Sequence, residues 1–177
     1  MRFAQLDRIL AIEPGRTITG IKSLSLSEEY LQDHFPRFPV MPGVLMLESI
    51  FQVGMYLVRA TDEFRISMVV LRETRNFKFQ GFVQPGDQLV VRAVWHSADQ
   101  TTVKLKVEGE ISGKNAVSGT MVLERFNLAD RGLGSQATDA YINFQFRKKY
   151  ELLFDPLKSG RGQNAETNHQ MVAAPSA

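Results

Sequence analysis

The sequence contains no cysteine and only three histidines. Without cysteine, neither a disulfide framework nor a thiolate metal site can form. His34, His96 and His169 stand far apart in the sequence, whereas the ligands of a metal site usually include closely spaced pairs. The glycines also form no phosphate-binding pattern. We therefore expect neither a bound metal nor another cofactor.

The chain has little excess charge of either sign. Its 21 Lys and Arg residues against 19 Asp and Glu residues give a net charge of +2, which is too small to indicate a nucleic-acid partner. No basic stretch followed by an apolar run stands at the N-terminus, so we expect no signal peptide and a cytoplasmic location. A length of 177 residues with 44% hydrophobic residues predicts one soluble globular domain with a sizeable core.

One stretch is unusually rich in proline and then in apolar residues. Pro36, Pro39 and Pro42 punctuate a short loop, and an apolar segment follows directly. Proline suits the first turn of a helix, so we expect a helix from near Pro42 to about Arg59. A helix that is apolar on nearly every side is normally buried in a core. It is short and carries a carboxylate and an amide, which argues against a membrane span.

Most of the remaining chain up to residue 126 has the pattern of strands. The clearest alternation lies in 102–110, where the apolar residues 103, 105 and 107 alternate with the charged residues 104, 106 and 108. One helix together with hairpin-connected strands predicts an α+β fold, with an antiparallel sheet wrapped around the buried helix. The expected strands are 7–13, 16–26, 66–79, 88–96, 102–110 and 116–125.

Two further helices are expected. Ser27 is a candidate N-cap for a short helix before His34. Beyond residue 126 we expect a C-terminal extension, 127–177, with a loop over 127–138 and a helix over 139–154. We interpret it as an accessory surface helix, with packing on a neighbouring subunit as the alternative. From Ser159 the residues are small and polar and predict a disordered tail.

Glu48 is the anomaly of the central helix, because burying a carboxylate is costly and normally raises its pKa. Gln52 lies one turn further on the same face and is expected to hydrogen-bond it. His34 in the preceding loop and Glu48 together make a candidate acid–base pair. The backbone N–H groups of Gly43 and Val44 at the start of the helix are placed to hold a developing oxyanion.

The stretch HFPRFPVMPGVLMLESIFQ, residues 34–52, resembles the signature of the FabZ-type β-hydroxyacyl-acyl-carrier-protein dehydratases, which have the hotdog fold. A second stretch, RNFKFQGFVQPGDQL, residues 75–89, resembles a conserved strand of the same family. The resemblance extends over roughly residues 6–126. It implies a hotdog domain over 1–126 that dehydrates (3R)-3-hydroxyacyl thioesters to trans-2-enoyl thioesters, in the synthesis of fatty acids or of related lipids and polyketides.

The resemblance assigns roles to individual residues. His34 matches the catalytic histidine, Glu48 the catalytic glutamate, and Gly43 the glycine whose amide polarises the thioester carbonyl. Gln52 matches the glutamine beside the glutamate. We add Val44, Phe77 and Phe79 as candidate substrate-binding residues, although Phe77 and Phe79 are most simply core residues.

The resemblance also implies partners. The substrate would arrive on an acidic acyl carrier protein, and no cofactor would be needed. In the family the histidine and the glutamate of one site come from different subunits, so a homodimer is expected, with hexamers formed as trimers of dimers as a further state. The basic residues Arg72, Arg75, Lys78 and Lys148 are most simply solvated, but some of them are candidates for docking the carrier protein.

The sequence departs from the family pattern at several positions. Arg37 replaces a glycine after the His-Phe-Pro motif, Phe51 replaces the usual alanine before Gln52, and the usual Pro-His-Arg start is absent. Two alternatives therefore stay open. One is a hotdog thioesterase, although such enzymes usually lack the His-Phe-Pro loop. The other is a non-catalytic acyl-binding protein, and Arg37 is the only reason to consider it.

Overall fold

The computed structural model describes residues 4–154, which form six strands, two α-helices and two short 3₁₀ helices. The helices are η1 (Glu29–Leu31), α1 (Gly43–Thr61), η2 (Ala129–Arg131) and α2 (Gln136–Leu153). The strands are β1 (Arg8–Glu13), β2 (Thr17–Ser23), β3 (Met68–Phe79), β4 (Gln88–Ala98), β5 (Thr102–Ile111) and β6 (Lys114–Phe126).

The six strands form one antiparallel sheet in the order β1-β2-β4-β5-β6-β3. Each predicted strand is present, with bounds that differ by a few residues. The predicted hairpin between β5 and β6 turns at Ser112 and Gly113, whose φ angles of 49° and 75° suit a two-residue turn. β1 and β3 are the edges of the sheet, and β3 offers its outer edge for pairing.

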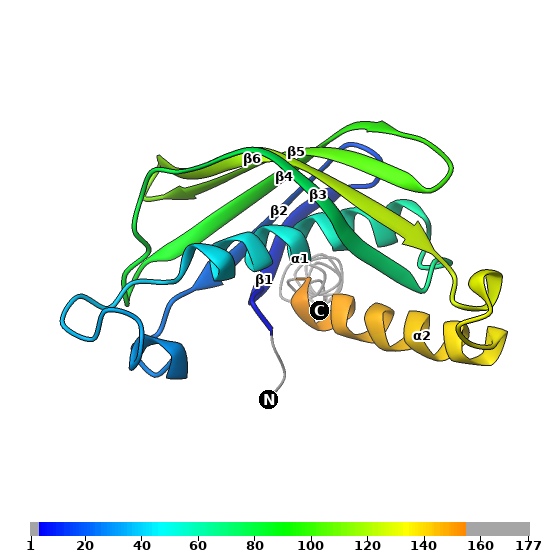
Figure 1. Cartoon of the computed structure of the whole chain (residues 1–177), viewed down its shortest axis with the longest axis horizontal. Coiled ribbons are helices and arrows are strands. Elements are labelled where there is room, and N and C mark those ends of the chain that lie inside the picture. Colours follow the sequence, from blue (N-terminus) through cyan, green and yellow to red (C-terminus); the bar gives the residue numbers. More distant parts are fainter. Residues whose placement is uncertain (1–3, 155–177) are drawn as a thin grey trace, which may run out of the picture.

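The sheet curves over one side of α1 (Figure 1), which confirms the predicted α+β arrangement. The apolar side chains of β5, Val103, Leu105 and Val107, are buried as their alternation predicted. Gly54 permits the close approach of α1 to the sheet, because a Cβ at this position would lie 2.8 Å from Leu105 Cδ1. The core of the protein therefore lies between the sheet and α1.

The length and composition of α1 would also allow it to cross a membrane. However, 67% of its apolar window is buried within the fold, as in the core helix of a soluble protein. Its apolar residues thus have a protein environment already.

Two helix starts differ from the prediction. Ser27 caps no helix, because its hydroxyl pairs with that of Ser25 at 2.8 Å and only the short η1 follows. α2 starts at Gln136 instead of residue 139, because the Ser135 side chain accepts a hydrogen bond from the Thr138 N–H at 3.1 Å. This capping adds almost a turn to the helix. The predicted tail from Ser159 lies outside the described residues.

α2 packs on α1 of the same chain. It runs beneath the second half of α1, on the side away from the sheet (Figure 1). The rings of Phe146 and Tyr150 lie 6.3 Å and 6.1 Å from that of Tyr56, and Tyr150 lies 5.2 Å from Phe64. α1 is consequently enclosed between the sheet and α2 over its C-terminal half.

Arg59 near the end of α1 is buried, with only 2% of its surface exposed. Its guanidinium donates to the carbonyls of Ile66 and Ser67 at 2.8 Å and 2.7 Å and lies 3.7 Å from the centroid of the Phe146 ring. Within residues 4–154 no carboxylate pairs with it. Burial lowers the pKa of Arg59 to about 10, so it remains charged at neutral pH. The extension therefore supplies part of the environment of a buried cation.

Replacement of Phe146 by alanine is expected to destabilise the protein by about 2 kcal/mol, because it removes aromatic packing and the ring that faces Arg59. Urea unfolding of the wild type and the Phe146→Ala variant measures this. The control is Phe144→Ala on the exposed face of α2, for which we expect a change within about 0.5 kcal/mol. Equal effects of the two substitutions would contradict the packing of α2 described here.

Candidate active site

The loop that carries His34 is held to the body of the protein at both ends. The His34 N–H donates to the Tyr30 carbonyl at 3.1 Å, and the Met41 N–H donates to the Val83 carbonyl at 2.9 Å. Val40 and Met41 are buried. The loop is therefore fixed immediately before α1 begins, as an active-site loop must be if it is to present a side chain in one position.

The ring of His34 has a defined tautomer. Its Nδ1 lies 2.9 Å from the Val40 carbonyl oxygen, which can only accept a hydrogen bond. Nδ1 must therefore carry a proton, and in the neutral ring Nε2 has the free lone pair. No hydrogen bond within residues 4–154 occupies Nε2. His34 is thus oriented as a proton acceptor, with Val40 acting as the group that positions it.

The residue after His34 is in an uncommon conformation. Phe35 has φ = 52°, the left-handed region that bulky side chains rarely adopt, and its ring meets that of His34 edge-on at 4.6 Å. Such conformations cluster at functional sites. Arg37 is not among the positive-φ residues, so the chain does not need glycine there, and its side chain is exposed.

Glu48 and Gln52 interact as predicted. The Gln52 amide Nε2 donates to Glu48 Oε1 at 2.7 Å, and the Gln52 Oε1 accepts from the Gln5 N–H at 3.0 Å. Gln5 fixes which way the Gln52 amide points, so that its NH₂ group faces Glu48. Glu48 is half-buried and has no cationic partner within residues 4–154. Gln5 was not predicted from the sequence, since no local pattern links two residues 47 positions apart.

The start of α1 presents unpaired donors. The N-cap residue is Pro42, which has no side chain to accept from the first helical N–H groups. Leu45 and Met46 donate to the Pro42 carbonyl, whereas the N–H groups of Gly43 and Val44 have no acceptor within the described chain. Free N–H groups at a helix N-terminus favour negative charge.

Gly43 is not required by the packing of its own chain. A Cβ at this position would meet only the Phe79 ring, at an ordinary contact distance of 3.5 Å. Without a side chain, this position at the start of α1 stays partly exposed. Val44 beside it is 71% exposed.

The N-terminal half of α1 has one open face. Among its first nine residues, those that are not buried are Gly43, Val44, Leu47, Glu48 and Phe51. This spacing places them on a single stripe of the helix. The free amides and Glu48 therefore lie along one surface, with Gln52 buried beneath it.

Phe77 and Phe79 on β3 border this region in different ways. Phe77 is partly buried and packs over Gly119, where a Cβ would lie 2.4 Å from its ring. Phe79 is 50% exposed and lies next to Gly43. The structure thus brings Phe79, Gly43 and Val44 together, while Phe77 is mainly a packing residue.

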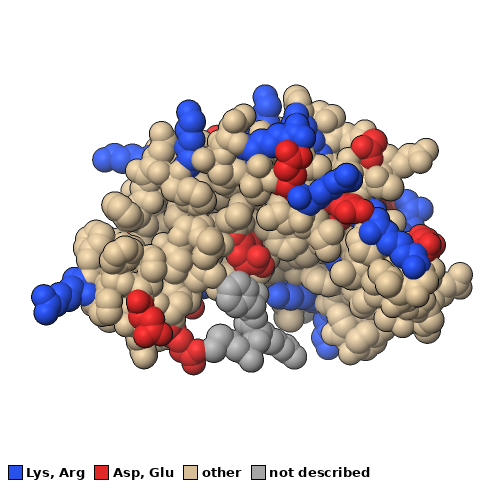
Figure 2. Space-filling model, in the orientation of Figure 1, with Lys and Arg blue, Asp and Glu red and all other residues tan. Residues whose placement is uncertain are grey.

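His34 and Glu48 are not joined within one chain. In the described residues His34 bonds to Val40 and Glu48 bonds to Gln52, and no hydrogen bond or ion pair links the two. Around them lie exposed apolar side chains, and in Figure 2 a broad uncharged surface extends from the left, where α1 begins, toward the middle. The exposed apolar residues on or beside the His34 loop and the start of α1 include Phe35, Phe38, Val44, Phe79 and Phe82.

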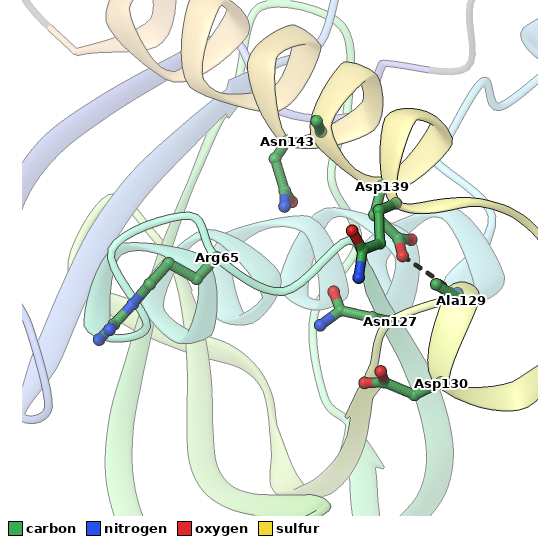
Figure 3. Close-up of a pocket in the computed structure, with 8 residues that line it drawn as sticks. Arg65, Asn127, Ala129, Asp130, Asp139 and Asn143 are labelled. Atoms are coloured by element: carbon green, nitrogen blue, oxygen red, sulfur yellow. Dashed lines mark hydrogen bonds between the residues drawn. The ribbon is translucent and has the colours of Figure 1, made fainter.

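A polar pocket of about 280 Å³ lies elsewhere, at the start of α2 (Figure 3). None of its lining residues belongs to the stretch from His34 to Gln52. Its carboxylate Asp139 accepts from the Leu128 and Ala129 N–H groups at 2.9 Å and 3.0 Å and from the Ser67 hydroxyl. Asp139 therefore ties the extension to the loop before β3, and we assign the pocket a structural origin.

Comparison with known proteins agrees with the hotdog prediction. A family model described as the FabA-like domain matches residues 1–120. A 3-hydroxyacyl-[acyl-carrier-protein] dehydratase FabZ of Rickettsia typhi is 37% identical over 117 residues, which cover 61% of this chain and 81% of that protein. The FabZ of Ruminiclostridium cellulolyticum is 32% identical over 117 residues, covering 66% of this chain and 82% of that protein.

Solved structures share the fold at low sequence identity. A chain of the dehydratase heterocomplex ApeI:P from Xenorhabdus doucetiae matches with a TM-score of 0.61 and 15% identity, over 71% of this chain and 84% of that one. A hypothetical thioesterase from Streptococcus pneumoniae, bound to coenzyme A, matches with a TM-score of 0.54 and 12% identity, over 68% and 85%. These structural matches show that the chain has the hotdog fold. The chain belongs to the FabA-like family and, within it, to the FabZ-type dehydratases.

The bonds to Asp139 predict a pH-dependent stability. The Ser67 hydroxyl, followed by the two N–H groups, lowers the pKa of Asp139 below its ordinary value. The stability that ionised Asp139 contributes to the fold is thus present above that ordinary pKa, near pH 4. It is lost as the pH falls through the lower folded-state pKa. We expect Asp139→Asn to have a lower Tm than the wild type at neutral pH, and the difference to shrink below about pH 4.

Thermal unfolding of both proteins at a series of pH values measures this difference. Ser67→Ala is the matched control, because it removes one donor and leaves the carboxylate. It should show a smaller loss at neutral pH. A gap between Asp139→Asn and the wild type that is independent of pH would contradict the assignment.

Proposed function

We propose that this enzyme removes water from (3R)-3-hydroxyacyl thioesters carried by an acyl carrier protein and releases trans-2-enoyl thioesters, as part of fatty acid synthesis. The observation that carries the proposal is the orientation of His34. Its loop is anchored and its Nδ1–H is held by Val40. Within residues 4–154 its Nε2 has no hydrogen-bond partner, and the helix that follows bears amides without acceptors and Glu48. The names of the relatives describe the same reaction.

The reaction has three chemical requirements. The α-hydrogen is weakly acidic and needs a base, the thioester oxygen gains negative charge as that proton leaves, and the β-hydroxyl departs only if it is protonated. An enzyme must therefore hold a base, an oxyanion donor and an acid around one substrate.

His34 would be the base. Its Nε2 lone pair would take the α-proton, and the positive charge formed on the ring would be stabilised by the bond from Nδ1–H to the Val40 carbonyl. A fixed tautomer avoids the need to reorient the ring in each turnover.

The Gly43 N–H would hold the thioester oxygen. In the part of the chain that the structure describes this donor has no acceptor, it lies at the positive end of α1, and the absent side chain leaves room for the carbonyl to approach. The neighbouring Val44 N–H is a second free donor, and the Val44 and Phe79 side chains would border the thioester.

Glu48 would act on the β-hydroxyl. In its acid form it would give its proton as the carbon–oxygen bond breaks, so that water leaves and the double bond forms between the α- and β-carbons. Gln52, fixed by Gln5, would keep the Glu48 carboxyl in place. Phe77 would contribute to the apolar wall beyond it.

A second copy of the chain would complete the site. In one chain His34 and Glu48 have separate partners, exposed apolar side chains surround both, and β3 presents a free sheet edge beside them. An isologous dimer would bury those side chains and bring His34 of one chain to Glu48 of the other. Three such dimers would form a hexamer without changing the site.

The carrier protein would approach through a basic surface. Of the candidate residues, Arg75 is already bound by Glu73 at 2.6 Å and 2.7 Å and is the weaker candidate. Lys78 stands next to Phe79 on β3, and Arg37 is exposed in the His34 loop. A cytoplasmic location would give the enzyme access to such a carrier.

Substitution of either proposed catalytic residue is expected to lower kcat by about 10²–10⁴-fold, the usual contribution of a positioned acid or base. The assay follows the absorbance of the enoyl thioester with crotonyl- and 3-hydroxybutyryl-carrier protein, for the wild type, His34→Ala and Glu48→Gln. Glu48→Gln keeps the shape of the side chain, so a loss with unchanged Tm reports on proton transfer.

His96→Ala is the control, since His96 lies on β4 outside the proposed site, and its activity should stay near that of the wild type. Release of free thiol without enoyl exchange would contradict the proposal and indicate a thioesterase. If the protein catalyses neither reaction with any acyl length tried, the result would indicate a non-catalytic acyl-binding protein.

A further inference from the structure

A buried lysine lies near the end of β2. Only 5% of the surface of Lys22 is exposed. Its ammonium forms an ion pair with Glu28 at 2.6 Å and lies 3.7 Å from a carboxylate oxygen of Asp7. A buried ion pair often adds little net stability, because the cost of removing both charges from water offsets their attraction. The place of these residues in the chain indicates a different role.

Glu28 begins the turn that leads to His34. The Glu28 carbonyl accepts from the Leu31 N–H at 3.1 Å, and the Tyr30 carbonyl accepts from the His34 N–H at 3.1 Å. Leu31, between these two bonds, is buried in the core. The segment from Glu28 to His34 is therefore one hydrogen-bonded unit. The ion pair with Lys22 fixes the start of this unit, and its end carries the proposed base.

Asp7 belongs to the segment that orients the side chain beside the proposed acid. Its carboxylate accepts from the Ser23 N–H at 2.7 Å, which ties the N-terminal segment to the end of β2. Two residues earlier, the Gln5 N–H donates to the Gln52 side chain at 3.0 Å, and Gln52 in turn donates to Glu48. The position of Asp7 on β2 thus helps to set the position of the Gln5 N–H.

One ammonium lies between these two supports. We propose that Lys22 is a positioning residue for the dehydration: it holds the turn before His34 and, through Asp7, the segment that orients Gln52 beside Glu48. The inference rests on the proposed function. In a dimer with shared sites, one Lys22 would act on the base of one site and on the acid of the other. Replacing it in every chain would then weaken both supports at both sites.

The test measures kcat, KM and Tm of the wild type, Lys22→Met and Glu28→Gln with 3-hydroxybutyryl-carrier protein. Each substitution removes one charge with little change of volume. We expect kcat to fall by about 10- to 100-fold in both variants and KM to stay within about twofold, since a small displacement of a catalytic group is costly only in the transition state. Glu28 is the less buried partner, so Glu28→Gln serves if Lys22→Met does not fold.

A second measurement separates positioning from a general loss of structure. In a His34→Ala background the positioned base is absent. Glu28→Gln should therefore lower the residual kcat of that background by less than about twofold. The same fold-loss of kcat in both backgrounds would overturn the inference.

Asp62→Asn is the matched control. Asp62 and Arg125 form an ion pair at 2.6 Å with 19% and 17% of their side chains exposed, at the opposite end of α1 from the His34 loop. Its loss should lower Tm and leave kcat near that of the wild type. Folded Lys22→Met and Glu28→Gln variants with wild-type kcat would overturn the inference, as would an equal loss of kcat in the control. In these cases the turnover of the wild type still supports the proposed dehydration, whereas a wild type without turnover would contradict both.

Discussion

The enclosure of α1 is the constraint on which the rest of the structure depends. The helix is apolar on almost every side, so each of its faces needs a partner. The sheet covers one side and α2 covers the C-terminal half of the other, held by Phe146 over the buried Arg59. What remains is the stripe from Gly43 to Phe51. The proposed chemistry uses this stripe, which the described part of the chain leaves partly uncovered.

The same constraint links packing to reactivity. Pro42 ends the His34 loop and leaves the first amides of α1 without acceptors within residues 4–154, so one residue both starts the helix and creates the proposed oxyanion site. Val40, buried next to that turn, fixes the tautomer of His34 through its carbonyl. The proposed acid, base and oxyanion donor would thus be held directly by backbone groups and by a buried amide, rather than by a network of charged side chains.

Much of the fold and of the candidate site could be predicted from the sequence, because these features depend on short-range patterns. Alternation in 102–110 predicted a half-buried strand, and Pro42 followed by an apolar run predicted α1. The pairing of Glu48 with Gln52 is a contact between adjacent turns and was also predictable. The Ser27 cap was wrong because Ser25 engages its hydroxyl, and the start of α2 was placed late because the Ser135 cap was overlooked. Three features could not be predicted, because no pattern of neighbouring residues records tertiary contacts or local strain. They are the bond from Gln5 to Gln52, the covering of Arg59 by α2 and the positive φ of Phe35.

The central claim is that His34 and Glu48 of different chains form one site. The most direct measurement is the hydration activity of purified mixed dimers, obtained by co-expressing a His34→Ala chain and a Glu48→Gln chain with different tags. In a shared-site dimer one of the two sites keeps both residues, so the mixed dimer should recover about half of the wild-type activity although each variant alone is inactive. A mixed dimer no more active than the two variants alone would contradict the account.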